Sequence, residues 1–149
     1  MTICDLHCDS ASLWQAGFSL EDTSLQVNLP HLVEAGVGLQ VFAAFVPASV
    51  PAGLRFPFVC RMIDRLKEEL QAHADRIVLC RNSREVAEAI DQGRTAAVLA
   101  VENGDAIEED LQKLDQLYRM GVRLMTLVHA RSNNWVISSA DENPAFQGL

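Results

Sequence analysis

Apolar residues along this chain gather into short runs that are separated by segments with helical spacing. The runs at 39–46 and 95–102 are almost continuously apolar, which favours parallel strands covered on both faces over strands with one face in water. Shorter runs of the same kind occur at 2–8, 76–80 and 122–128. The pattern therefore predicts a strand over each of these ranges.

Helical patterns lie between the predicted strands. Apolar residues recur every three or four positions along 59–73, which is the spacing of an amphipathic helix. Further helices are predicted from an Asn28 cap to Gly36, from a Ser83 cap to Gly93, and from Asp105 to Gly121. The segments 10–26, 47–57 and 131–149 are predicted to be irregular, with Trp14 and Phe18 anchoring the first of them. Strands that alternate with helices indicate an α/β fold with a parallel sheet.

The composition is that of a globular domain. Hydrophobic residues make up 49% of the 149 residues and charged residues 21%, which is typical of a folded chain of about one domain. The formal net charge of −8 argues against a nucleic-acid or anionic-membrane partner. We find no targeting signal and no apolar stretch of the roughly 20 residues that span a bilayer. With no C-x-x-C pair among four cysteines, the sequence predicts a cytoplasmic protein with reduced thiols.

A His-x-Asp motif lies at the end of the first predicted strand. Alternation along a strand places His7 and Asp9 on one face, and Cys4, Leu6 and Cys8 on the other. An imidazole nitrogen and a carboxylate oxygen side by side are suited to one divalent metal, at about 2.0–2.2 Å from zinc. A histidine that simply hydrogen-bonds a neighbouring carboxylate remains an alternative. A zinc site that also uses the two thiols is disfavoured, because they face away from the imidazole.

Two further predicted strands end in polar residues. Glu102 ends the run at 95–102, above Val98 and Ala100 on the same face, and His129 follows the run at 122–128. A single glutamate at a strand end is usually solvated or caps a helix. Because parallel α/β folds build their sites where the carboxyl ends of several strands meet, we expect Glu102 and His129 to join His7 there.

Several motifs, in this order and at this spacing, carry a family resemblance. They are Asp5-Leu6-His7-Cys8-Asp9, Asn28-Leu29-Pro30-His31-Leu32 with Gly36-Val37-Gly38-Leu39-Gln40, Val101-Glu102-Asn103-Gly104, the residues 114–118 with Gly121-Val122-Arg123, and Leu124-Met125-Thr126-Leu127-Val128-His129. With them the chain resembles the N-terminal half of the membrane (renal) dipeptidase family of zinc metallopeptidases.

The resemblance implies a (β/α)8 TIM-barrel-type fold of the amidohydrolase kind with two zinc ions. His7 and Asp9 match the ligands of the first metal, Glu102 matches the carboxylate that bridges both metals, and His129 matches the histidine that contacts the substrate. The family hydrolyses small dipeptides, with tolerance for a D-residue at the carboxyl side, using a water held between the metals. We therefore expect a zinc-dependent dipeptidase.

The sequence departs from the family in two loops and in length. Asn103 stands where the family usually has glycine, and 131–139 only approximates an Asn-x-x-Trp-Ala-Asp-like stretch. A closed barrel needs about 250 residues, so 1–149 is expected to be the N-terminal half of a single barrel domain. The remaining histidine ligands and the acid that handles the proton are expected outside it, since His31 and His73 do not replace them.

Three expectations follow from this length, and two alternative functions remain. We expect residues 1–149 alone to bind zinc weakly, to be inactive, and to associate through open sheet edges, for example as a homo-oligomer. Another metal-dependent hydrolase of the same barrel type is one alternative, although no lysine lies near a strand end to bridge two metals. A non-catalytic remnant that binds ligands or a partner is the other.

Overall fold

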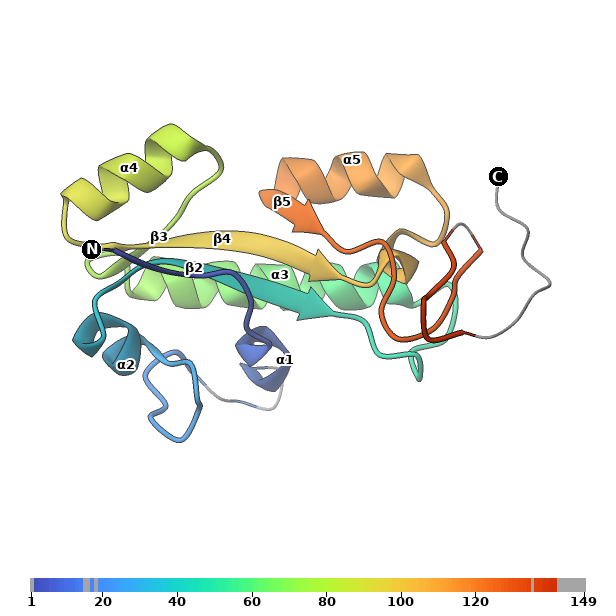
Figure 1. The fold of residues 1–149 in the computed structure, drawn as a ribbon, viewed down its shortest axis with the longest axis horizontal. Coiled ribbons are helices and arrows are strands. Elements are labelled where there is room, and N and C mark those ends of the chain that lie inside the picture. The colour runs from blue at the N-terminus through green and yellow to red at the C-terminus, as the bar shows by residue number, and fades with distance from the viewer. Residues whose placement is uncertain (1, 15–16, 18, 135, 142–149) are drawn as a thin grey trace.

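The protein forms one parallel β-sheet with helices packed around it (Figure 1). The computed structural model describes residues 2–14, 17, 19–134 and 136–141. The strands are β1 (Ile3–Asp5), β2 (Val37–Phe45), β3 (Ile77–Leu79), β4 (Thr95–Glu102) and β5 (Val122–Met125). The helices are α1 (Ser10–Trp14), α2 (Leu29–Glu34), α3 (Arg55–Ala72), α4 (Ser83–Asp91), the short 3-10 helix η1 (Gly104–Ile107) and α5 (Leu111–Met120). The predicted α/β fold is confirmed.

The strand order brings the carboxyl ends of β1, β2, β4 and β5 to one edge of the sheet. All pairings are parallel, with β2 between β1 and β4. On its other side, β4 pairs with β3 along 95–97 and with β5 along 99–101. The short β3 therefore occupies only the amino half of that edge, and β5 reaches the end where Glu102 lies.

The side chains of β2 and β4 alternate between two faces. The face covered by helices belongs to the main core and contains Phe42, Ala44, Leu99 and Val101. The opposite face, which we call the inner face, is formed by Val41, Ala43 and Ala100 with Leu39 and Val98 packed against them. Both strands bury side chains on both faces, which explains their almost continuous apolar runs.

Helix α3 contributes more buried apolar side chains to the core than any other described helix. Its buried apolar side chains are Val59, Met62, Ile63, Leu66 and Leu70, and burying each large side chain contributes about 1.5–3 kcal/mol. The predicted amphipathic helix is therefore confirmed. No helix in the described ranges is both long enough and apolar enough to cross a bilayer.

The first predicted strand is shorter than expected, and its alternation breaks. β1 ends at Asp5, which pairs with Gln40. Cys8 still bonds to β2, donating to Val41 O at 3.0 Å and accepting from the Ala43 N–H at 2.9 Å. Three residues of the first segment thus span two of β2, and this bulge shifts the side chains.

As a result, Leu6 and Cys8 do not share a face, contrary to the sequence prediction. Leu6 is 68% exposed and lines a hollow on the inner face together with His7 and Ala43, whereas Cys8 is buried in the main core. The bulge between them is the cause, because an extra residue reverses the side-chain alternation that follows it.

Other predicted boundaries were wrong in ways that have local causes. The segment after Asp9 is not irregular but forms α1, and the strand predicted to Val128 ends at Met125. Asn82, not Ser83, caps α4, by accepting the Glu85 N–H at 3.0 Å.

Two helix predictions need similar corrections. The helix predicted from Asp105 is split into η1 and α5. α3 begins at Arg55, so Pro57 lies in its first turn, where the missing N–H costs no bond. The anchoring roles predicted for the Trp14 and Phe18 side chains lie outside the described part of the chain.

Candidate metal centre

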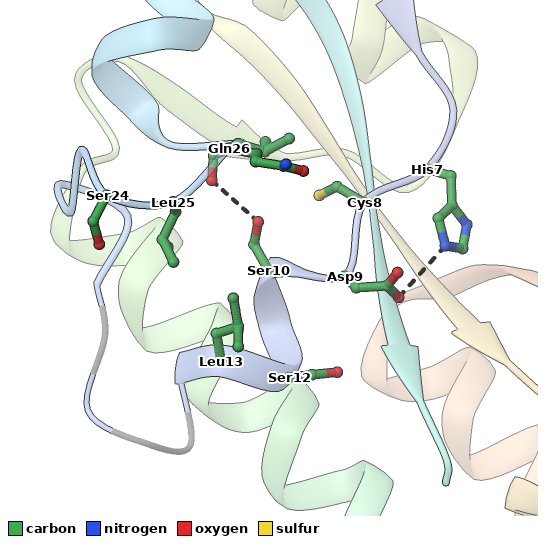
Figure 2. A pocket seen from close by; sticks show the side chains of 10 residues that line it. His7, Cys8, Asp9, Ser10, Ser12, Leu13, Ser24, Leu25 and Gln26 are labelled. Atoms are coloured by element: carbon green, nitrogen blue, oxygen red, sulfur yellow. Dashed lines mark hydrogen bonds and ion pairs between the residues drawn. The ribbon is translucent and has the colours of Figure 1, made fainter.

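Three donor side chains meet at the carboxyl edge of the sheet. His7 follows β1, Asp9 directly precedes α1, and Glu102 is the last residue of β4. The His7 Nε2 lies 3.5 Å from Asp9 Oδ1 and 3.3 Å from Glu102 Oε2. One donor atom from each of the three residues lies within 4.8 Å of the others. Figure 2 shows the imidazole and the Asp9 carboxylate turned toward each other.

Glu102 lies between two histidines, with one oxygen toward each. Its Oε1 is 3.5 Å from His129 Nε2, while Oε2 faces His7. The Glu102 side chain is 15% exposed, against 46% for His7 and 44% for His129. A carboxylate partly withdrawn from water attracts a nearby cation more strongly than a fully solvated one. The geometry allows Glu102 to serve two positively charged or hydrogen-bonding groups at once.

The backbone after Glu102 is held in an unusual conformation by Asn103. Asn103 has a φ of 85° and a ψ of 111°, a positive-φ conformation that glycine adopts most easily. Its Nδ2 donates to Val46 O at 3.2 Å, its Oδ1 accepts the Asp105 N–H at 3.1 Å, and its N–H donates to Thr126 Oγ1 at 2.9 Å. The family that the chain resembles usually has glycine at this position. Asparagine suits the turn here because its side chain makes two of these bonds.

His129 lies beyond β5, beside the three-donor group. Its ring and the Phe45 ring form a T-shaped pair, with centroids 4.7 Å apart at 68°, a favourable aromatic geometry. Phe45 ends β2 and pairs with Glu102 across the sheet. Within the described residues, the group of closely spaced metal donors contains His7, Asp9 and Glu102 and leaves His129 out.

Sequence reasoning missed Phe45 as a neighbour of the site. The available signal was its position at the end of β2, two residues beyond Ala43, whose side chain lies on the inner face. Its contact with His129 depends on how two distant segments meet, which no local pattern records.

Cys8 borders the site but does not belong to the three-donor group. Burial raises the pKa of its thiol to about 12, so the thiol stays protonated at neutral pH in the absence of a metal. A hollow of about 510 Å³ is lined by residues of α1, by the segment 24–27, and by His7, Cys8 and Asp9 (Figure 2). Cys4 is exposed, so the disfavoured Cys/His site gains no support.

The two other histidines have partners elsewhere. His31 lies in α2, with its Nδ1 2.6 Å from Asn28 Nδ2. His73 follows α3 and pairs with Glu21 at 3.4 Å. As expected, neither belongs to the three-donor group.

The donor set is chemically suited to a divalent metal. One imidazole nitrogen and two carboxylates match the ligands of zinc, and they also accommodate manganese or cobalt. Barrel proteins build their sites from side chains at the carboxyl ends of parallel strands, and the three-donor group lies at that end of this sheet.

Comparison with known proteins identifies the family within this class. The chain belongs to the membrane dipeptidase family (peptidase family M19), whose family model matches residues 1–149. A curated relative, Dipeptidase verJ of Clonostachys rogersoniana, is 34% identical over 60% of this chain and 23% of its own length.

Solved structures share the fold. The metallopeptidase dipeptidase AC of family M19 superposes with a TM-score of 0.79 at 24% identity, over 88% of this chain and 44% of that chain. A metallopeptidase from Rhodobacter sphaeroides, liganded with a phosphinate mimic of the dipeptide L-Ala-D-Ala, gives 0.77 at 21% identity, over 89% and 46%. The chain thus spans less than half the length of these relatives. The likeness confirms the TIM-barrel-type fold class.

Proposed function

We propose that residues 1–149 form the first half of a (β/α)8 metallo-dipeptidase barrel. In this proposal His7 and Asp9 would hold a first zinc ion, Glu102 would be a ligand shared with a second, and His129 would contact the substrate. The observation that carries the proposal is the position of Glu102, with one oxygen 3.3 Å from His7 and the other 3.5 Å from His129. The family of the chain and the donor set both support it.

Each of these side chains has a separate chemical task. A divalent ion held here would supply Lewis-acid polarisation of a carbonyl and a water of lowered pKa. Asp9 and Glu102 provide the negative charge that retains a cation. An imidazole N–H of His129 can donate to the substrate oxygen that becomes negative as the peptide bond breaks. Phe45, packed edge to face on that ring, restrains its orientation.

The substrate class we propose is a small dipeptide, with a D-residue accepted at the carboxyl side. The dipeptide mimic bound to the Rhodobacter sphaeroides metallopeptidase supports this choice for a related fold. Tolerance of both configurations is tested in a complete barrel that contains these residues, by comparing hydrolysis of L-Ala-D-Ala and L-Ala-L-Ala with the products separated by chromatography. Cleavage of the L,L substrate alone would contradict the proposed tolerance.

Metal binding provides the decisive test. In a complete barrel that contains these residues, zinc titration calorimetry should give at least about tenfold weaker binding for Glu102→Gln, because the variant keeps the shape of the side chain but loses its charge. Glu88→Gln is the matched control, since Glu88 lies in α4 and pairs with Arg84. Equal zinc affinity in wild type and Glu102→Gln would refute the proposed ligand role.

The role of His129 has its own test. In a complete barrel that contains these residues, His129→Ala should lower turnover of L-Ala-D-Ala while bound zinc, measured by elemental analysis, stays nearly unchanged. Loss of zinc in this variant would place His129 among the ligands instead.

A further inference from the structure

His129 is presented by a tight turn rather than by a strand. The last bond to β4 is made by Thr126, whose N–H donates to Val101 O at 3.0 Å. Five residues after Thr126, the Arg131 N–H donates to His129 O at 2.7 Å, across Ala130 with a φ of 60°. This is a three-residue turn whose central residue has a positive φ, a rare and strained arrangement for a residue with a side chain.

Ser138 holds this turn from the other side of the same loop. Its Oγ donates to Ala130 O at 3.0 Å, and the Ala140 N–H donates to the same Oγ at 3.2 Å. Its own N–H donates to Ser132 Oγ at 2.9 Å. Ser138 is only 7% exposed, so water does not readily replace these bonds. The carbonyl at the centre of the turn is therefore fixed by a buried hydroxyl.

We propose that Ser138 is a positioning residue for His129. By holding the Ala130 carbonyl, it keeps the turn closed and the imidazole against the Phe45 ring and the Glu102 carboxylate. Ser138 lies near the end of the described chain, far in sequence from His7 and Asp9. It acts on His129 through the backbone of Ala130. The effect of this positioning on binding of a dipeptide substrate rests on the function proposed above for His129. The effect on the orientation of the His129 ring does not depend on that function.

Strain gives the physical reason for this role. A positive φ at a residue with a side chain persists only where the surrounding structure enforces it. Without the Ser138 hydroxyl, Ala130 can relax toward negative φ, and its carbonyl must then rotate. Since His129 is the preceding residue, this rotation would carry its ring away from Phe45 and Glu102.

Imidazole NMR of the protein labelled at histidine provides the test. The His129 carbon–proton signal, assigned with His129→Gln, should be displaced by the Phe45 ring, and Phe45→Leu should remove that displacement. Ser138→Ala should move the signal at least half of the way to its position in Phe45→Leu and broaden it. Ser138→Thr, which restores a hydroxyl, should recover the wild-type position, and Ser139→Ala at the exposed neighbour should leave it unchanged.

Binding of the phosphinate mimic of L-Ala-D-Ala to a complete, zinc-loaded barrel that contains these residues is the second readout. Ser138→Ala should weaken it on the order of tenfold, as a small misplacement of a substrate-contacting group does, but should cause no further loss in a His129→Ala background. A displaced His129 signal without this coupled loss would support the positioning and refute the substrate role of His129.

If the His129 signal does not move in folded Ser138→Ala, the positioning role is overturned, whatever the effect of the variant on binding of the phosphinate mimic. If Ser138→Ala does not fold, Ser138→Cys decides the question, because it keeps the volume and has a weaker donor. A smaller displacement in the same direction supports the proposal, and a wild-type signal overturns it.

Discussion

Replacing Asn103 measures how strongly the turn after the candidate site depends on one side chain. Asn103 is 7% exposed, and both polar atoms of its side chain are bonded, to Val46 O and to the Asp105 N–H. In Asn103→Ala both bonds are lost, each contributing about 0.5–1.5 kcal/mol. The alanine must also hold a φ of 85°, which costs about 1 kcal/mol beyond asparagine.

The sum predicts that Asn103→Ala lowers the free energy of unfolding by about 2–4 kcal/mol. Asn103→Gly loses the same two bonds, but it adopts a positive φ freely and should be about 1 kcal/mol more stable than the alanine variant. Urea unfolding followed by circular dichroism measures both differences.

Gly36→Ala isolates the backbone cost in the same assay. Gly36 has a φ of 68°, and a side-chain carbon added there would meet no atom within 4 Å. We expect a loss of about 1 kcal/mol from strain alone. An Asn103→Ala variant as stable as Asn103→Gly would refute the reasoning, because it would show that the turn relaxes without penalty.

Three further predictions concern charge, thiol reactivity and association. Burial by itself raises the pKa of Glu108, but hydrogen bonds from Lys113 and two backbone N–H groups outweigh burial and lower it. The stability that ionised Glu108 contributes is therefore present above the unfolded-state pKa of about 4.3 and is lost as pH falls through the folded-state value. Glu108→Gln should cost about 1 kcal/mol in urea unfolding at pH 7 and almost nothing at pH 3, and a constant difference would contradict this. Iodoacetamide at pH 8 should label exposed Cys4 well before buried Cys8, as read by mass spectrometry, and comparable labelling would show that the core opens readily. Leu124→Lys should reduce self-association in sedimentation velocity, because Leu124 is 48% exposed in β5, and an unchanged distribution would exclude this edge as the contact.

The sequence by itself determined the elements whose signals are local. The apolar run at 95–102 predicted β4 with its observed bounds, including the final Glu102, because a buried parallel strand needs apolar side chains on both faces. Gly121 ended α5 as predicted, since its φ of 109° lies in the region glycine favours. The spacing of His7 and Asp9 also predicted two donors within reach of each other. It did not predict which oxygen of Glu102 lies beside His7 or the distance between them.

Only the tertiary structure decided how these elements meet. No local pattern shows that β3 and β5 share one edge of β4, that the chain bulges between Asp5 and Cys8, or that Phe45 packs on His129. Each depends on hydrogen bonds or packing between segments far apart in the sequence, and many registers satisfy the same apolar pattern until the whole sheet selects one. The turn at Ala130 is the clearest case, because a residue with no preference for positive φ is held there by the surrounding loop.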